Sequence, residues 1–158
     1  MAEKFYNKKI AEVINTFLTM DDWRYSFNKE NGLFNFNLNI KGAIREIRYV
    51  IGVEENCYLV YAVSPISVDN NDAEKMSAMA QFICRANYGL KNGNFELDMR
   101  DGEIRYKCYV DCADIVPSLA VVKNSIYTVA LTFGHYSAGI IGVSFGLMTP
   151  EEAIAKCE

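Results

Sequence analysis

Two stretches of the chain alternate apolar and polar residues on both sides of a dipeptide that ends in glycine, and this pattern constrains the fold more than any other feature. In the first stretch, residues 23–40, the dipeptide is Asn31-Gly32. Asn-Gly between alternating runs is the strongest short-range signal for a β-hairpin. With Asn31 and Gly32 as a two-residue turn, Phe27 faces Phe36 and apolar residues lie opposite one another. A slip of one residue would turn the aromatic side chains toward water, so the alternation fixes the buried face.

The second stretch, residues 93–107, carries seven charged side chains around Asp101-Gly102. A two-residue turn there predicts three pairs of opposite charge across the hairpin: Glu96 with Lys107, Asp98 with Arg105, and Arg100 with Glu103. A general acid or base needs a carboxyl group in a cleft with a shifted pKa, whereas paired carboxylates on a solvated sheet face stay ionised. We therefore interpret these acids as groups that stabilise a hairpin, and not as a catalytic or metal site.

The remaining segments supply helical patterns and two further strands. In chain order we expect a helix at 3–19, the first hairpin, strands at 43–53 and 57–64, a helix from an Asp72 N-cap to Gly89, the second hairpin, a helix beginning at Pro117, and a short helix opened by a Thr149-Pro150-Glu151-Glu152 capping box. This order, α-β-β-β(-β)-α-β-β-α, predicts an α+β fold in which helices cover one face of an antiparallel sheet made of a meander plus a hairpin. We expect a single domain over residues 1–158.

Charge, the N-terminal segment and cysteine content limit the partners, the cellular location and the cofactors that we expect. The net charge is -4, and without a basic stripe to neutralise phosphates we expect no nucleic-acid partner. The N-terminal segment has no apolar export signal, so we expect a cytoplasmic protein with reduced thiols. The cysteines are Cys57, Cys84, Cys108, Cys112 and Cys157. They lack zinc-ligand spacing, and we expect small buried hydrophobes with no metal and no cofactor.

Residues 125–148 form a run of 24 residues without a formal charge. Uncharged runs of this length are candidates for a membrane span, but this one contains several glycines and hydroxyl residues and has no basic flank at its C-terminal end. A buried helix fits the pattern better, either in the core or at a dimer interface. We expect a dimer or partner face formed by Tyr127, Leu131, Ile140 and Ile141, with membrane attachment through residues 125–148 as an alternative.

Two polar residues lie in apolar surroundings. His135 is the only histidine, so any Ser-His-Asp or Cys-His site must use it. We expect it to be a hydrogen-bonded interior histidine, and an enzyme of unrecognised type that uses His135 remains the alternative. Asn87 falls near the buried stripe of the second helix, where we expect its amide to bond backbone carbonyls or the following loop.

Residues 85–107, "RANYGLKNGNFELDMRDGEIRYK", resemble the signature segment of the YbjN-like family of bacterial domains. The strings "DDWRYSF", "YAVSP" and "TPEEAI" are similar too, and the resemblance extends over residues 5–156. It implies a fold like that of type III secretion chaperones, often homodimeric, in a family described as bacterial sensory-transduction regulators. The family carries no catalytic residues that could be assigned to this chain. The run at 125–148 is more apolar than a helix that merely covers such a sheet requires.

Three hypotheses follow from the sequence. The first is a non-enzymatic regulatory or chaperone-like binding protein, a cytoplasmic homodimer that holds a protein or peptide segment, because the long apolar helix needs a partner surface. The second is an enzyme that uses His135, and the third is a membrane-associated protein.

Overall fold

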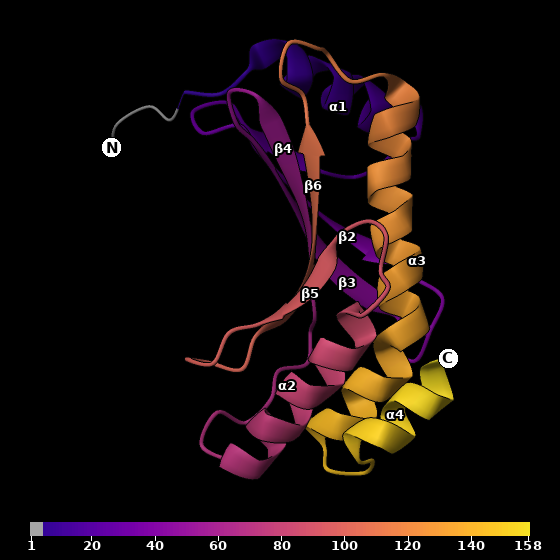
Figure 1. Ribbon diagram of the computed structural model, residues 1–158. Helices are drawn as coiled ribbons and strands as arrows, with labels where there is room; N and C mark the ends of the chain where they lie inside the picture. The colour runs from indigo at the N-terminus through magenta and orange to yellow at the C-terminus, as the bar shows by residue number, and fades with distance from the viewer. Residues whose placement is uncertain (1–4) are drawn as a thin grey trace.

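The computed structural model describes residues 5–158, which form four helices and six strands (Figure 1). The elements are α1 (Lys8–Met20), β1 (Ser26–Asn28), β2 (Leu33–Asn39), β3 (Glu46–Val53), β4 (Cys57–Val63), α2 (Ala73–Asn87), β5 (Asn94–Leu97), β6 (Ile104–Asp111), α3 (Leu119–Ser144) and α4 (Pro150–Cys157). The predicted α+β class and the order of elements are confirmed.

The six strands form one antiparallel sheet in the order β1-β2-β3-β4-β6-β5. Helix α3 runs alongside the sheet, with α1 near one end of it and α2 and α4 near the other (Figure 1). On one face of the sheet, alternate residues of neighbouring strands are fully buried with the helices, among them Phe34, Tyr49, Val60 and Tyr106. Their neighbours in sequence lie on the other face and are partly exposed. The alternation of apolar and polar residues therefore places one set of side chains in the core and the other set on the outer face, as a period of two predicts.

Local signals set most helix ends. Asn7 caps α1, which therefore begins later than predicted, and residues 3 and 4 of the predicted helix lie outside the described residues. Asp72 caps α2, and the Thr149–Glu152 capping box of α4 is present, as predicted. Pro117 lies outside α3, because Ser118 is the N-cap and accepts a hydrogen bond from the amide of Val121.

Both hairpins differ from the predicted register by two residues. Phe27 faces Phe34 and not Phe36, and Glu96 faces Arg105 and not Lys107. Because side chains alternate with a period of two, a shift of two leaves every residue on its predicted face. The predicted burial was therefore right although the predicted partners were wrong.

The reason for the shift is that each turn has four residues instead of two: residues 29–32 follow the pair Asn28–Leu33, and residues 99–102 follow the pair Asp98–Glu103, where the Asp98 amide donates to the Glu103 carbonyl at 2.9 Å. The two turns are built alike. In each, the glycine amide donates to a carbonyl four residues earlier: Gly32 to Asn28 at 3.0 Å, and Gly102 to Asp98 at 2.8 Å. The side chains of Asn28 and Asp98 also each accept a hydrogen bond from the amide two residues later, at 2.9 Å. Each glycine ends its loop with a positive φ, so the X-Gly dipeptide is the last half of a longer turn.

The long apolar helix α3 packs across the sheet. The hydroxyl of Tyr49 donates to the carbonyl of Ile126 at 2.9 Å, and the Tyr58 hydroxyl and Ser125 Oγ are 3.0 Å apart. Within residues 5–158, α3 is the one helix long and apolar enough to cross a bilayer, but 61% of its most apolar 18-residue window is buried inside the fold. Much of the apolar surface of α3 is therefore buried inside this fold.

Candidate functional site

The four residues expected to form a partner face do not share a surface. Leu131 is 72% exposed and Tyr127 is partly exposed, whereas Ile140 is fully buried and Ile141 packs against the core. The inclusion of Ile140 was wrong, because α4 and α2 pack against α3 and contribute to the core cluster that contains Ile140. The exposed stripe of α3 instead contains Lys123, Tyr127, Leu131 and His135, each four residues from the next.

Tyr127 has a contact inside the monomer that accounts for its position. Its hydroxyl donates to Asp21 Oδ2 at 2.9 Å, and its ring meets Trp23 edge-on with centroids 6.0 Å apart. Hydrogen bonds from Trp23 and Tyr127 hold the pKa of the Asp21 carboxyl below its ordinary value. Tyr127 therefore links α3 to the end of α1, and Leu131 is the most exposed apolar residue of the expected face.

His135 is exposed, so the expectation of an interior histidine was wrong. Its ring meets that of the neighbouring Tyr136 edge-on, with centroids 5.0 Å apart. Within residues 5–158 no hydrogen bond or ion pair joins His135 to a carboxylate or thiol. Sequence context misled here because an apolar run can include the solvent-facing stripe of a helix.

Two acids of the second hairpin, Glu96 and Asp98, are paired with cations; the predicted pair Glu96–Lys107 is present, whereas Asp98 pairs with Arg100 and not with Arg105. Glu96 bonds both Arg105, at 2.7 Å, and Lys107, while Asp98 bonds Arg100 at 2.6 Å. Partial burial acts to raise the pKa of Glu96, but hydrogen bonds from Lys107 and Arg105 outweigh it and the pKa lies below its usual value. The hydrogen bond from the Arg100 side chain lowers the pKa of Asp98 to about 2. These carboxylates are ionised at neutral pH.

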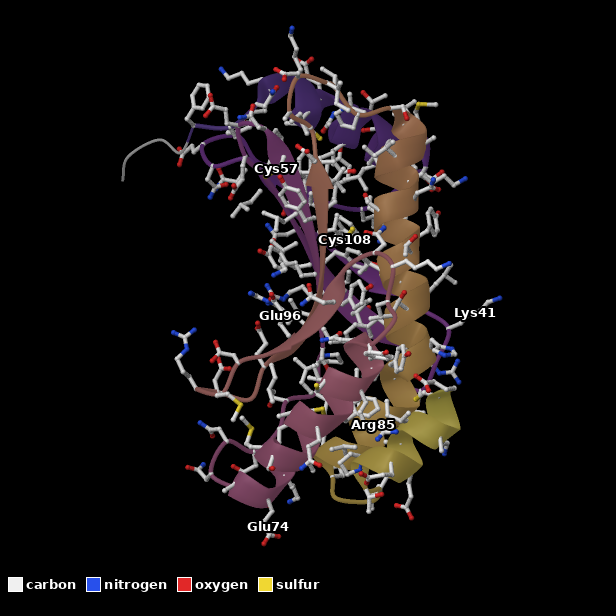
Figure 2. The ribbon with its side chains drawn as sticks, in the orientation of Figure 1. Lys41, Cys57, Glu74, Arg85, Glu96 and Cys108 are labelled. Atoms are coloured by element: carbon white, nitrogen blue, oxygen red, sulfur yellow. The ribbon has the colours of Figure 1, made fainter. Side chains whose placement is uncertain are left out.

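The cysteines are free thiols, and all but Cys84 are buried. Cys57 on β4 and Cys108 on β6 lie on neighbouring strands (Figure 2). Burial raises the pKa of both thiols, which keeps them protonated. Within residues 5–158 no three His, Cys, Asp or Glu side chains lie close enough together to hold a metal ion.

Asn87 behaves as expected. Its Nδ2 donates to the carbonyl of Phe95 at 3.0 Å, and the amide of Phe95 donates to its Oδ1 at 2.7 Å. The side chain thus joins the end of α2 to β5, which is the last strand of the sheet on that side.

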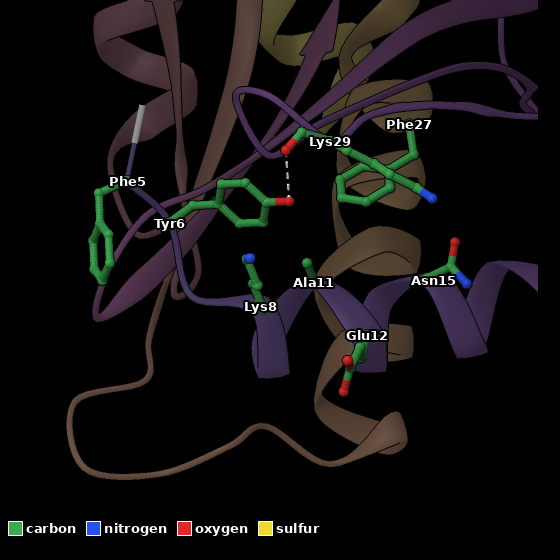
Figure 3. A pocket seen from close by; sticks show the side chains of 8 residues that line it. All are labelled: Phe5, Tyr6, Lys8, Ala11, Glu12, Asn15, Phe27 and Lys29. Carbon is green, nitrogen blue, oxygen red and sulfur yellow. Dashed lines mark hydrogen bonds between the residues drawn. The ribbon is translucent and has the colours of Figure 1, made fainter. Parts of the chain in front are cut away.

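The structure contains a hollow that the sequence did not predict, between α1 and β1 at the other edge of the sheet (Figure 3). Its volume is about 780 Å³, within the usual range for ligand sites, although it is open to solvent. The lining residues are Phe5, Tyr6, Lys8, Ala11, Glu12, Asn15, Phe27 and Lys29.

Aromatic rings give the hollow a firm apolar wall. Phe27 stacks on the buried Phe34 with centroids 4.2 Å apart, and Tyr6 meets Phe27 edge-on at 6.3 Å. The Tyr6 hydroxyl donates to the carbonyl of Lys29 at 2.9 Å, which ties the chain before α1 to the β1–β2 loop (Figure 3). The apolar lining is therefore continuous with the core.

The extended chain before α1 creates this hollow. The amide of Asn7 donates to the carbonyl of Glu54 at 3.0 Å, and its Nδ2 donates to the carbonyl of Glu55 at 3.1 Å. These bonds hold Tyr6 over Gly32 of the hairpin loop, where an added Cβ would lie 2.7 Å from the Tyr6 ring. In sequence, Tyr6 fits the apolar stripe of a helix equally well, so no local signal could have separated the two placements.

No model of a known protein family matches the sequence, and no curated protein is significantly similar to it. Inference about function therefore depends on this chain's own residues.

Proposed function

We propose that this protein is a non-enzymatic binding protein, regulatory or chaperone-like, that holds a peptide or protein segment in the hollow between α1 and β1. The observation that carries the proposal is an open hollow with aromatic side chains at an edge strand of the sheet. Exposed apolar surface beside an edge strand favours another polypeptide, because such an edge offers both side-chain contacts and unpaired backbone groups.

The resemblance to the YbjN-like family supports the same class of function. The strings that carry the resemblance have structural roles: Asn87 bonds Phe95, Gly89 ends α2 with a positive φ, and Gly102 closes the β5–β6 loop. We propose membership of this family and a cytoplasmic location on that basis. A regulatory role is part of the same proposal.

We also propose a homodimer, in which the contact surface on α3 consists of Leu131 and the exposed part of the Tyr127 side chain. Sedimentation at micromolar concentration measures the oligomeric state directly, and Leu131→Lys is the variant that would separate the copies. A monomeric wild-type protein would remove the homodimer and leave the hollow unaffected, since the hollow lies at β1.

Site-specific photo-cross-linking tests the binding function. A benzoylphenylalanine residue at Asn15, an exposed position that lines the hollow, is expected to capture a protein partner in the host cell. The matched control places the same probe at Glu74, an exposed position in the first turn of α2 (Figure 2). Equal capture at both positions, or none at Asn15, would contradict the proposal.

The two alternatives make separate predictions. A membrane protein would pellet with membranes, whereas the binding proposal expects recovery in the soluble fraction. For an enzyme using His135, no carboxylate or thiol within residues 5–158 forms a hydrogen bond or ion pair with the exposed imidazole.

A further inference from the structure

We propose that the hollow selects segments in which a large apolar side chain lies next to acidic residues. This inference rests on the proposed binding function and names the chemistry of the partner at the same site.

Two ammonium groups flank the wall. Lys8 lines the hollow from α1 and Lys29 lines it from the β1–β2 loop. Within residues 5–158 neither lysine forms an ion pair, whereas Lys75 and Lys107 elsewhere in the fold do. In Figure 3 the Lys8 side chain points from α1 toward Tyr6.

Among residues 5–158 one acid, Glu12, lines the hollow, and it does not neutralise the two lysines. Glu12 points to the opposite side of α1 from Tyr6 and Phe27 in Figure 3, and no ion pair joins it to Lys8 or Lys29. The hollow therefore offers net positive charge beside an apolar wall.

The start of α1 adds to this positive charge. Acids in the first turn of a helix complement its dipole, and α2 and α4 follow that rule with Glu74 and with Glu151 and Glu152. Helix α1 begins instead with Lys8 and Lys9 and has no acid in its first turn. Two cations at this end oppose the dipole, and an anionic partner would relieve that opposition.

A segment of matching chemistry would use both features. Its apolar side chain would pack on Phe27 and Tyr6, and carboxylates next to it would form charge-assisted hydrogen bonds with Lys8 and Lys29. Opposite charges at the rim would mainly increase the association rate and the selectivity, while the apolar contact would supply affinity.

Selection from a random peptide display library with the full chain tests the inference. We expect enriched peptides to carry Asp or Glu next to a large apolar residue. The best selected peptide should bind a Lys8→Glu, Lys29→Glu double variant at least about tenfold more weakly than it binds the wild type. It should bind the control Lys41→Glu, Lys91→Glu, whose lysines are exposed and do not line the hollow, about as well as the wild type. Lys8→Glu places an acid in the first turn, which favours the helix, so this variant is not expected to unfold.

Each outcome has a defined meaning. Enriched apolar peptides without an acidic preference, which lose binding in Phe27→Ser, would overturn the inference and leave the binding function in place. A folded chain that enriches no peptide would contradict both. Binding to phosphatidylglycerol vesicles that depends on Lys8 and Lys29, without peptide enrichment, would overturn the inference in favour of an anionic lipid surface.

Discussion

The side chain of Asn87 makes two hydrogen bonds with the main chain of Phe95, one to the amide and one to the carbonyl. Asn87 is the last residue of α2, and Phe95 lies in β5 at an edge of the sheet. The primary amide offers a donor and an acceptor in the spacing that a neighbouring strand would offer. It thereby satisfies two backbone groups of the edge strand β5, whereas β1 at the other edge borders the hollow.

Asn87→Ala should therefore lower the free energy of unfolding by about 2 kcal/mol, because both backbone groups of Phe95 lose a partner. Urea unfolding followed by circular dichroism measures the change. The control is Asn37→Ala, an exposed asparagine of β2 whose amide donates to Glu46 at 3.3 Å, for which we expect less than about 0.5 kcal/mol. Equal effects in the two variants would show that the Asn87 bonds contribute little to stability.

Asn87 illustrates what could be predicted from sequence. Its position near the buried stripe of a helix required a hydrogen-bond partner, and the following loop was the nearest source. The hairpin partners could not be predicted in the same way. Asn31-Gly32 and Asp101-Gly102 satisfy the rules for a two-residue turn and for the end of a four-residue loop, and alternation is unchanged by a shift of two.

The glycine that ends the second loop is tightly packed. A Cβ at Gly102 would collide with the main chain of Val68, whose amide donates to the Gly102 carbonyl at 3.0 Å. Gly102→Ala should cost about 3 kcal/mol, the sum of the positive-φ penalty and the clash. Gly89 is the matched control, since it also has a positive φ but nothing lies within 4 Å of an added Cβ.

Gly89→Ala should cost only about 1 kcal/mol, which is the backbone penalty alone. Thermal or urea unfolding of the two variants gives the difference. If Gly102→Ala were no more destabilising than Gly89→Ala, the segment before α2 would not be held against the hairpin.

The positions of His135 and the hollow lay beyond sequence reasoning for a physical reason. Which stripe of α3 faces solvent depends on how the helix is rotated against the sheet, and an almost uniformly apolar helix does not encode that rotation strongly. The hollow depends on where the chain before Asn7 crosses the hairpin, which is a contact between segments far apart in sequence.

Glu96 should give the second hairpin a pH-dependent stability. Its folded-state pKa is lowered, so its contribution is fully present above its unfolded pKa of about 4.3 and is lost as the pH falls through the folded value. Glu96→Gln should lower stability at pH 7 by about 1 kcal/mol, a modest value because its partners Arg105 and Lys107 are partly exposed.

Unfolding free energies measured from pH 7 down to pH 3 should therefore show the wild-type protein and Glu96→Gln converging in acid. Glu30→Gln provides the control, because Glu30 is an exposed acid in the loop of the first hairpin. A gap between wild type and Glu96→Gln that stayed constant to pH 3 would mean that the charge of Glu96 is not what stabilises the hairpin.

Two buried tyrosines should make the attachment of α3 to the sheet sensitive to alkali. Burial raises the pKa of Tyr49 and of Tyr58. Each contribution is present below the unfolded pKa of about 10 and is lost as the pH rises toward the folded value, so stability should fall above about pH 10. Tyr49→Phe removes one of these titrating groups and should weaken that fall.

At neutral pH the two variants should differ in cost. Tyr49→Phe removes the bond to the Ile126 carbonyl and should cost about 1 kcal/mol. Tyr58→Phe should cost less, because Ser125 Oγ keeps its hydrogen bond to the carbonyl of Val122 at 2.8 Å. Unfolding curves at pH 7 and at pH 10.5 measure both effects. A larger loss for Tyr58→Phe would mean that Ser125 depends on the tyrosine hydroxyl and not on its own helix.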